Sequence, residues 1–527
     1  MKKIWFCLAF FILGSALNAQ DNLSALLPMP NQVKMLRSMP FSCAVGETSY
    51  RIAGENLDFA KQTLCKVFQQ QMDICLKEAS AGEEASVVLQ IDESITDKER
   101  YLLSVEPNGI VIKGATPGAV LYGVVTLEQL MMGDICTTRS KQIVAVSIDD
   151  APRFHHRALM LDPARHFLPL DDVKFFIDQM MKFKYNVLQL HLTDDEGWRI
   201  AIHKQPQLAS KDHYTQNQLK ELIAYAAQRN IEIIPEIDVP GHTVAILDAY
   251  HELACSNQRD EDIKVGKSTG KMLCASNPKV YKIMQDVIDE VCNLFPSSLI
   301  HLGGDEAAVA KNWAKCEECQ ALMKKKGYTQ PEQLMIPFFD RILRMVRANH
   351  KRPILWCELN NIYPPADNYL FPYPEDVVLV AWRAGLTPTC QKLTSQHGHA
   401  LIMAPGEYAY YDYPQYKNDL PELLNWGMPT TTLRKVYDFD PGYGRPMAEQ
   451  KHIWGVMGTL WGEAIIDINR ATYMAFPRAL ALAEAGWTDM ENRSWESFRE
   501  RLYPNLNALM KQGVSVRVPF EISPYRK

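Results

Sequence analysis

Short apolar runs recur eight times between residues 157 and 457, and polar or aromatic residues follow each of them. The runs cover residues 157–162, 187–192, 231–237, 299–302, 353–357, 377–382, 400–404 and 453–457. Between them lie segments with the apolar spacing of amphipathic helices, such as 170–183, 216–229 and 278–294. Eight strand–helix units over roughly 300 residues predict an α/β fold of the (β/α)8 TIM barrel type rather than an open doubly wound sheet. Neither GxGxxG nor GxxxxGKS/T follows any run, so the phosphate loop of a nucleotide-binding fold is missing.

The residues before the barrel have a different pattern. Alternating apolar and polar residues at 86–91, 101–105 and 109–113 predict strands, and helical spacing at 59–75 and 115–131 predicts two helices. We therefore expect a small α+β domain over residues 21–150, a barrel over residues 151–505 and a C-terminal tail over residues 506–527 that packs on the barrel.

The first 20 residues have the layout of a signal peptide. Lys2 and Lys3 precede the apolar run Ile4 to Leu13, and small residues near Ala19 suit cleavage. The run is shorter than the roughly 20 residues that span a bilayer, so we expect an exported, soluble protein, periplasmic or secreted, without a membrane span. Lys and Arg total 56 against 62 for Asp and Glu, a balance that argues against nucleic acid and anionic membranes as partners.

The cysteines leave their pairing open. Of 12 cysteines, Cys7 would leave with the signal peptide, so 12 − 1 = 11 remain, an odd number. Cys255 and Cys274 bracket a polar loop that a disulfide would pin. Cys316 and Cys319 form a CxxC motif, but a zinc site needs a second pair of ligands and no nearby CxxC or HxxxH supplies one. A local disulfide or two free thiols is therefore the favoured interpretation.

The residues that follow the runs are candidates for an active site, because a TIM barrel places its site at the C-terminal ends of its strands. Each run leads into carboxylates, aromatic rings or arginine. In chain order they include Asp162, Arg165, His166, His191, Asp194, Asp195, Glu196, Trp198, Arg199, Glu236, Asp238, His242, Asp305, Glu306, Trp356, Glu358, Trp382, Arg383, Glu407, Tyr408, Tyr410, Tyr411, Asp412, Trp461 and Glu463. A ring of acids and aromatics suits a neutral polyhydroxylated ligand, a sugar, because carboxylates accept hydroxyl protons and indole faces cover the apolar side of the ring.

Asp305 and Glu306 are the most informative pair. Neighbouring residues on a regular strand point to opposite faces, so both carboxyls reach one pocket only if the strand has ended. Gly303 and Gly304 permit such a turn. Two close carboxylates in a partly dry pocket repel each other, which favours one acid and one anion, the arrangement that glycoside cleavage uses.

Asp238 and His242 lie four residues apart across a Val-Pro-Gly turn, which could place the imidazole over the pocket with the acid orienting it. An alternative set of His191, Asp194, Asp238 and His242 would suit a metal-dependent hydrolase, although no HxH pair follows the first run. Trp356, Trp382 and Trp461 each lie at or just after the end of a predicted strand, and at one level they would form a box around a small substituent.

Five ordered motifs between about Arg153 and Trp487 resemble those of glycoside hydrolase family 20, the β-N-acetylhexosaminidases. The motifs are Leu161-Asp-Pro-Ala-Arg-His-Phe167, His191-Leu-Thr-Asp-Asp-Glu-Gly-Trp-Arg199, Pro235-Glu-Ile-Asp-Val-Pro-Gly-His-Thr243, His301-Leu-Gly-Gly-Asp-Glu306 and Leu460-Trp-Gly-Glu463. The small N-terminal domain also resembles the usual companion of this family. The resemblance implies exo-acting release of terminal GlcNAc or GalNAc from an oligosaccharide or glycoconjugate by substrate-assisted retention, without a metal or cofactor.

The resemblance also implies roles for individual residues. Glu306 would protonate the leaving oxygen, Asp305 would orient the acetamido group, and Tyr410 would hydrogen-bond the acetamido oxygen. Asp238 and His242 would tune Glu306. The sugar would be held by Arg165, Asp194, Asp412 and Glu463 and walled by Trp356, Trp382 and Trp461. One departure is visible, because Glu196 stands where the family commonly has Gln.

Two other functions remain open beside this one, a metal-dependent hydrolase and a glycan-binding protein that has lost catalysis. The intact Asp305–Glu306 pair argues against the second. The choice between GlcNAc and GalNAc and the oligomeric state are open as well.

Overall fold

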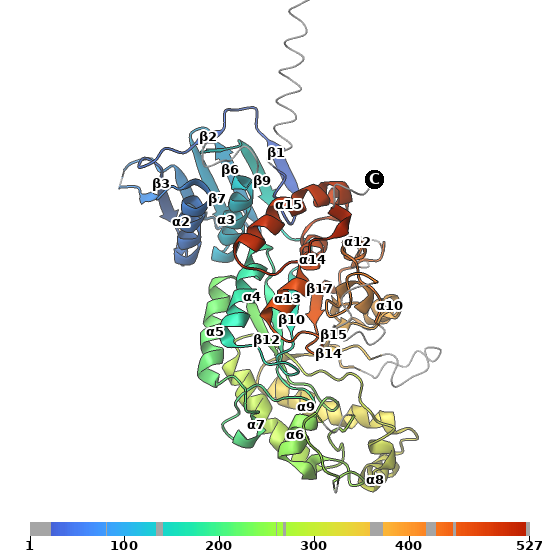
Figure 1. Ribbon diagram of the computed structural model, residues 1–527. Helices are drawn as coiled ribbons and strands as arrows, with labels where there is room; N and C mark the ends of the chain where they lie inside the picture. The colour runs from blue at the N-terminus through green and yellow to red at the C-terminus, as the bar shows by residue number, and fades with distance from the viewer. Residues whose placement is uncertain are drawn as a thin grey trace, which may run out of the picture.

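The computed structural model describes residues 23–80, 82–132, 141–259, 261–266, 270–358, 373–417, 428–445 and 450–522. The signal peptide expected at residues 1–20 lies outside the described residues. A small domain on a seven-stranded sheet, blue in Figure 1, precedes a closed barrel. Among the helices of the described ranges, none combines the length and apolar character that crossing a membrane requires.

Eight parallel strands close into a barrel in chain order. They are β10 (His156–Leu161), β11 (Val187–His191), β12 (Glu232–Glu236), β13 (Leu299–His301), β14 (Arg352–Trp356), β15 (Val378–Ala381), β16 (Leu401–Met403) and β17 (Ile453–Leu460). Strands β10 and β17 complete the closure by pairing in parallel, from His156 opposite Gly455 to Leu161 opposite Leu460. The TIM barrel expected from the eight apolar runs is confirmed, and only β17 differs clearly from its run, ending at Leu460 instead of residue 457.

Helices surround the barrel and cover its connections. They are α4 (Leu170–Lys182), α5 (Gln216–Gln228), α6 (Val244–Ala249), α7 (Pro278–Leu294), α8 (Glu317–Lys326), α9 (Met335–Ala348), α10 (Thr387–His397), α11 (Gly406–Ala409), α12 (Leu433–Tyr437), α13 (Ile468–Ala475), α14 (Arg478–Trp487) and α15 (Trp495–Lys511). Short 3-10 turns are η1 (Pro206–Leu208), η2 (His251–Leu253), η3 (Trp313–Lys315), η4 (Pro331–Leu334), η6 (Met490–Asn492) and η7 (Phe520–Ile522). Local signals set their starts: Thr215 and Gln218 form a capping box at α5, and Asn277 caps α7 ahead of Pro278.

The core has two layers. Alternate strand residues such as Ala158 and Met160 of β10 pack with Ile234, Ile354 and Met457 in a cluster of their own. Their neighbours on the same strands join a larger cluster with the apolar faces of the helices. This alternation follows from the period of two in a strand and explains why the runs read as continuously apolar.

The small domain carries a mixed sheet of order β1-β9-β6-β7-β5-β3-β4 and a separate β2–β8 pair. Its elements are β1 (Gln32–Met35), β2 (Phe41–Ser42), β3 (Ser49–Ala53), α2 (Asp58–Met72), β4 (Lys77–Glu78), β5 (Val87–Ile91), β6 (Tyr101–Glu106), β7 (Gly109–Gly114), α3 (Pro117–Met131), β8 (Gln142–Ile143) and β9 (Val146–Asp150). The expected α+β domain is confirmed, with both predicted helices and all three predicted strands in place.

A buried polar contact joins the two domains. Oδ2 of Asp150, at the end of β9, accepts hydrogen bonds from Tyr101 (2.7 Å) and from the indole of Trp487 (2.9 Å). The ammonium of Lys184, from the barrel, lies 3.4 Å from the same oxygen, and both charged side chains are fully buried. The small domain is therefore fixed to the N-terminal side of the barrel.

Helix α15, red in Figure 1, lies beside the start of the small domain. Arg501 donates to the Leu26 carbonyl (2.8 Å), and the Asn505 amide donates to the Ala25 carbonyl (2.9 Å). The domain boundary expected after residue 505 falls inside this helix, which runs to Lys511. The C-terminal tail therefore does not begin at residue 506, because the apolar spacing of α15 continues past it.

Candidate active site

The turn after β13 presents the acidic pair. Gly303 and Gly304 both have positive φ (64° and 97°), and an added Cβ on Gly303 would lie 1.7 Å from Oδ1 of Asp238. The same oxygen accepts a hydrogen bond from the Gly304 amide (3.1 Å). Glu306 itself has a left-handed φ of 47°, a conformation that is uncommon and strained for a non-glycine residue. Strand β13 therefore ends before Asp305 and Glu306, as predicted from the sequence, and the hydrogen bond between Asp238 and Gly304 stabilises the turn that follows.

Asp305 and Glu306 face one imidazole. Nε2 of His242 lies 3.7 Å from Oδ2 of Asp305 and 3.8 Å from Oε2 of Glu306. The Asp305 side chain is nearly buried at 10% exposure, whereas the Glu306 side chain is 50% exposed. An enclosed carboxylate beside an accessible carboxyl is the arrangement expected of an anionic group and a proton donor.

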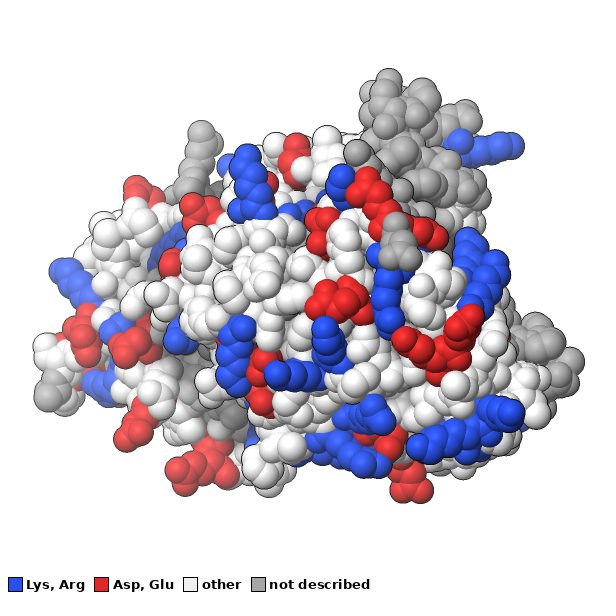
Figure 2. Space-filling view, turned by 90° about the horizontal axis from the view of Figure 1, so that it is seen from below, with Lys and Arg blue, Asp and Glu red and all other residues white. Residues whose placement is uncertain are grey.

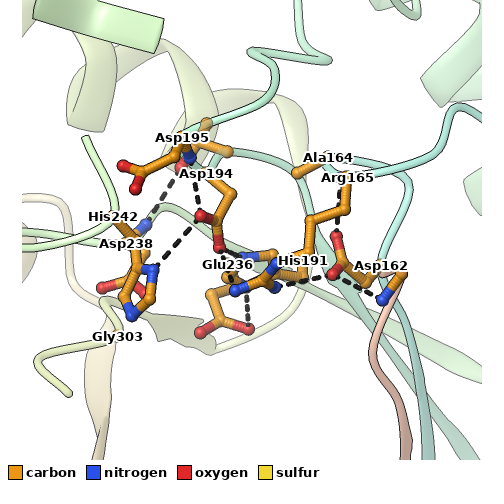
Figure 3. A network of polar contacts seen from close by, with 12 residues as sticks. Asp162, Ala164, Arg165, His191, Asp194, Asp195, Glu236, Asp238, His242 and Gly303 are labelled. Atoms are coloured by element: carbon orange, nitrogen blue, oxygen red, sulfur yellow. Dashed lines mark hydrogen bonds and ion pairs between the residues drawn. The ribbon is translucent and has the colours of Figure 1, made fainter. Parts of the chain in front are cut away.

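Asp194, rather than Asp238, orients His242. Nδ1 of His242 lies 3.2 Å from Oδ1 of Asp194, and Oδ2 of Asp194 is 2.7 Å from Nε2 of His191 (Figure 3). The interpretation that Asp238 orients His242 is corrected, because His242 is hydrogen bonded to Asp194 and Oδ1 of Asp238 instead accepts from the Gly304 amide. Burial opposes the imidazolium form of His242, but the Asp194, Asp305 and Asp238 carboxylates outweigh it and raise the pKa of His242 well above its usual value.

Arg165 sits at the centre of a second acidic group (Figure 3). Its guanidinium lies 2.7 Å from Asp162, 3.0 Å from Asp194 and 3.1 Å from Glu463. It also lies over the ring of Trp461, 5.1 Å from its centroid. Burial opposes the charge of Arg165, yet these carboxylates raise its pKa well above the usual value, so the guanidinium is a permanent cation on the rim.

The three tryptophans meet around Tyr410. The rings of Trp382 and Tyr410 are stacked at 6.4 Å, those of Tyr410 and Trp461 are 6.2 Å apart, and those of Trp356 and Trp461 are 5.6 Å apart. Tyr408 points elsewhere and stacks on Phe439, whereas the ring of Tyr413 lies 5.3 Å from that of Tyr410. The structure therefore brings together the aromatic box expected from the strand ends.

Asp412 lies deep in the same region. Burial, and to a lesser extent the charge of Glu463, raises the pKa of Asp412 to about 8. Both carboxyls follow the last two strands of the barrel, as expected. The raised pKa favours the protonated form of Asp412 near neutral pH, and in that form the carboxyl can donate a hydrogen bond as well as accept one.

Two residues that received no role from the sequence complete the pocket. Arg383, after β15, lies 3.6 Å from Oε1 of Glu306 and 3.2 Å from Oε1 of Glu358, which follows β14. Burial raises the pKa of Glu358 to about 7, although the Arg383 charge opposes this. Both residues lie two positions after the end of a barrel strand, and this placement at the C-terminal rim is the sequence signal that could have identified them.

Glu236 was likewise given no role. It accepts a hydrogen bond from the indole of Trp356 (2.8 Å) and lies 2.9 Å from His191 and 3.1 Å from His301. The groups His191–Glu236–Asp238 and Asp194–Asp238–His242 each bring their ligand atoms within 4.8 Å, as a metal-dependent hydrolase would need. Both nitrogens of His191 already face carboxylates, however, and Asp194 is paired with Arg165. These donors fit an ion-pair network better than a metal site.

A cavity of about 1300 Å³ lies at the other end of the barrel, between the small domain and the strand starts. Its lining includes His155, His156 and Trp454, and none of the acidic pair or the tryptophan box. On the face seen from below in Figure 2, acidic and basic side chains are intermingled. Because neither the acidic pair nor the tryptophan box lines this cavity, it is separate from the candidate active site at the C-terminal ends of the strands.

Cleavage of a glycosidic bond requires a proton donor for the leaving oxygen and a negative group near the anomeric carbon. Glu306 and Asp305 can supply both on this rim, and the class of protein that the fold and site define is the glycoside hydrolases. Residues 154–490 match the family model described as glycosyl hydrolase family 20, catalytic domain, and residues 23–151 match glycosyl hydrolase family 20, domain 2. The chain belongs to glycosyl hydrolase family 20.

Named relatives agree with this family. A beta-hexosaminidase of Akkermansia muciniphila is 37% identical over 452 residues, covering 82% of this chain and 88% of that protein. A beta-hexosaminidase of Vibrio furnissii is 32% identical and covers 88% of this chain and 76% of that protein. Among solved structures, a GH20 exo beta-N-acetylglucosaminidase from Vibrio harveyi in complex with N-acetylglucosamine superposes with a TM-score of 0.81 at 30% identity, covering 94% of this chain and 78% of that chain.

Proposed function

We propose that this glycosidase is an exo-acting β-N-acetylhexosaminidase that releases terminal, non-reducing β-linked GlcNAc or GalNAc by substrate-assisted retention. The observation that supports this most is the position of Asp305 and Glu306 around His242, beside a box of three tryptophans and Tyr410. The largely buried Asp305 carboxylate can accept the N–H of an acetamido group, and the neighbouring aromatic rings can cover its methyl group.

In the first step the acetamido oxygen of the substrate forms a bond to the anomeric carbon. Glu306 gives its proton to the glycosidic oxygen as the bond from that oxygen to the anomeric carbon breaks. Asp305 accepts the acetamido N–H and offsets the positive charge of the oxazolinium, while Tyr410 donates to the acetamido oxygen. Because the nucleophile belongs to the substrate, no second enzyme carboxylate has to bond to the sugar.

In the second step Glu306, now a carboxylate, removes a proton from water. The water oxygen bonds to the anomeric carbon, the carbon–oxygen bond of the oxazolinium breaks, and the acetamido group is restored. Two displacements at the same carbon give net retention. His242 stays protonated through both steps because Asp194 stabilises its charge, and Asp238 holds the turn that presents Glu306.

The hydroxyl groups of the terminal sugar meet the Arg165 group. Arg165, Glu463 and the protonated Asp412 offer donors and acceptors at the end of the pocket away from Glu306. Asp194 is buried, and its oxygens already contact Arg165, His191 and His242. We therefore assign Asp194 to positioning these groups rather than to contacting the sugar.

Glu306→Gln tests the proposal. Its loss of kcat on an aryl N-acetyl-β-glucosaminide should be at least about 100-fold, the lower range for a general acid–base residue. The loss should be larger for an alkyl aglycone, because a poorer leaving group depends more on protonation. Asp305→Asn should lose activity with both substrates alike, since it acts on the acetamido side. Glu221→Gln on the surface of α5, with a side chain 60% exposed, is the matched control and should retain activity.

Full activity in either active-site variant would overturn this function. A thiazoline that mimics the oxazolinium separates catalysis from binding alone: tight binding without turnover by the wild-type protein would indicate a glycan-binding protein. Loss of wild-type activity on chelation with an unchanged melting temperature would instead support the metal-dependent hydrolase. For location, we propose that residues 1–20 direct export to the periplasm or the medium, which N-terminal sequencing of the mature protein would test.

A further inference from the structure

Four buried cysteines from two separate loops converge near the active-site face. Cys255 follows η2 and Cys274 precedes α7, both in the connection after β12. Cys316 occupies the N-cap position of α8, without a side-chain capping bond, and Cys319 lies in the first turn of this helix, in the connection after β13. All four side chains are fully buried, and their sulfur atoms all lie within 4.8 Å of one another.

This arrangement corrects the interpretation of the CxxC motif. Its second ligand pair exists, but it is Cys255 and Cys274, which are 19 residues apart (274 − 255) and form no recognisable motif. The disulfide considered between them is not formed, because both are free thiols in the structure. Only the folding of one loop against the other brings the two pairs together.

The sulfur separations match a tetrahedral metal site. Sγ of Cys274 lies 3.6 Å from Sγ of Cys319 and 3.9 Å from Sγ of Cys316. Four thiolates at a zinc–sulfur distance of about 2.3 Å in tetrahedral geometry stand about 3.8 Å apart, whereas disulfide sulfurs stand about 2.0 Å apart. These two separations lie on either side of the tetrahedral value, and the other sulfur pairs lie within 4.8 Å.

Two hydroxyl groups and a helix N-terminus lie beside the sulfurs, and the Glu318 carboxylate lies 4.0 Å from Sγ of Cys274. The hydroxyl of Ser276 lies 3.1 Å from Sγ of Cys274, and that of Ser256 lies 3.3 Å from Sγ of Cys316. The N-terminus of α8 carries the positive end of the helix dipole at Cys316 and Cys319. Such polar neighbours are the usual outer shell of a cysteine metal site, and a purely apolar cluster of thiols has no need of them.

We propose that Cys255, Cys274, Cys316 and Cys319 bind one structural Zn²⁺ ion. Four thiolates leave no open coordination position, so this ion has no part in the hydrolysis of the sugar. Soft thiolate ligands in a tetrahedron select Zn²⁺ over the oxygen-preferring ions Mg²⁺ and Ca²⁺. The site goes beyond the hydrolase activity and does not depend on it.

The ion would fasten together the two loops that carry the catalytic groups. Leu273, next to Cys274, donates its amide to the Pro240 carbonyl (3.0 Å), and its own carbonyl accepts from the indole of Trp313 (2.8 Å). Gly241 follows Pro240 and packs against the Asp305 backbone, since an added Cβ there would lie 3.1 Å from the Asp305 carbonyl oxygen. The proposed zinc ligand Cys274 thus directly follows Leu273 in the sequence, and the contacts of Leu273 and Gly241 help to hold His242 beside Asp305.

Metal analysis of the full chain, expressed with its leader and purified without chelator, tests the site. Elemental mass spectrometry should find about one zinc per chain in the wild type. Cys319→Ser should hold at least about tenfold less zinc and should melt at a lower temperature. Cys292→Ser is the matched control: this cysteine is also buried, in α7 of the same region, but lies outside the cluster, so its zinc should stay at the wild-type level.

Two measurements on the wild type keep the proposal testable if Cys319→Ser does not fold. A mercurial thiol reagent should release the zinc in step with the modification of the four cysteines, and Co²⁺ exchanged into the site should give the visible bands of tetrahedral thiolate coordination. A zinc-free protein whose intact mass shows two disulfides among these cysteines would overturn the proposal. Stoichiometric iron instead of zinc would overturn the identity of the ion.

Discussion

His242 and Asp194 are hydrogen bonded at 3.2 Å although they follow different barrel strands, β12 and β11. Through this contact a buried carboxylate keeps the imidazole charged, and the opposite ring nitrogen faces Asp305 and Glu306. The same carboxylate also binds Arg165. Asp194 therefore couples the sugar-binding and proton-transfer halves of the site without facing the substrate.

Asp194→Asn should lower kcat by about 100-fold, the lower range for a group that sets the protonation of an acid–base site. Burial lowers the pKa of His242 and Asp194 raises it, so removing the Asp194 charge lets the pKa fall. His242 then loses its proton at a lower pH, and the alkaline limb of the kcat/KM profile should move toward acid. A pH–rate profile on an aryl N-acetyl-β-glucosaminide measures this.

The control for that variant is Asp171→Asn, since the Asp171 side chain is 95% exposed on the first turn of α4. It should reproduce the wild-type profile. An Asp194→Asn profile with its alkaline limb unmoved would show that Asp194 does not set the charge of His242.

Glu196→Gln should remove a pH dependence of KM near neutrality. Burial and the Asp194 charge raise the pKa of Glu196 to about 7, and its carboxyl lies 3.9 Å from the Arg165 guanidinium. Above pH 7 the ionised Glu196 competes with sugar hydroxyls for Arg165, so wild-type KM should rise between pH 6 and 8. Because Glu196 is partly exposed, we expect a rise of only about twofold to fivefold. Initial rates at pH 6, 7 and 8 check it, and an equal rise in the variant would contradict the role of Glu196.

Asp150→Asn should destabilise the junction between the domains. It leaves the buried Lys184 ammonium without its partner, and removing one member of a buried ion pair costs about 3–5 kcal/mol. Burial already lowers the pKa of Lys184 to about 8, although Asp150 opposes this, so removing the Asp150 charge should lower that pKa further. Urea unfolding followed by tryptophan fluorescence gives the midpoint.

The preceding residue provides the comparison. Asp149 forms a surface ion pair with Arg100 and its side chain is 33% exposed, so Asp149→Asn should cost less than about 1 kcal/mol. Similar midpoints for the two variants would mean that the buried pair does not stabilise the junction.

The barrel could be predicted from sequence because each strand is a short, largely apolar run, and a cluster of polar or aromatic residues follows it. The same rule located Arg165, Asp305, Trp382 and Glu463, since the carboxyl ends of parallel strands share one rim. Partners across loops could not be predicted in this way. Asp238 is closer to His242 in sequence than Asp194 is, yet the glycine turn takes its carboxylate.

The cluster of four cysteines could not be predicted from the sequence for the same reason. Cys255 and Cys274 are joined to Cys316 and Cys319 by the packing of two long loops, which has no period or spacing in the sequence. The end of the last barrel helix was also missed, since α15 continues past Pro504 to Lys511 although a proline usually interrupts a helix. Local patterns predicted elements, and tertiary packing decided which polar side chains meet.

Gly303→Ala should lower kcat strongly, because the alanine would both strain the backbone and clash with a neighbouring side chain. An L-residue at φ 64° is strained by about 1 kcal/mol, and its Cβ would collide with the Asp238 carboxylate that fixes the turn. Gly327→Ala isolates the backbone strain: Gly327 ends α8 at φ 72°, and an added Cβ there has no atom within 4 Å. We expect a small fall in melting temperature and normal kcat for Gly327→Ala, but at least about a 100-fold loss of kcat for Gly303→Ala, since displacement of a catalytic group by about 1 Å has that effect. Thermal melts with kinetics on one aryl substrate measure both, and equal kcat values would show that the Asp238 contact does not position Glu306.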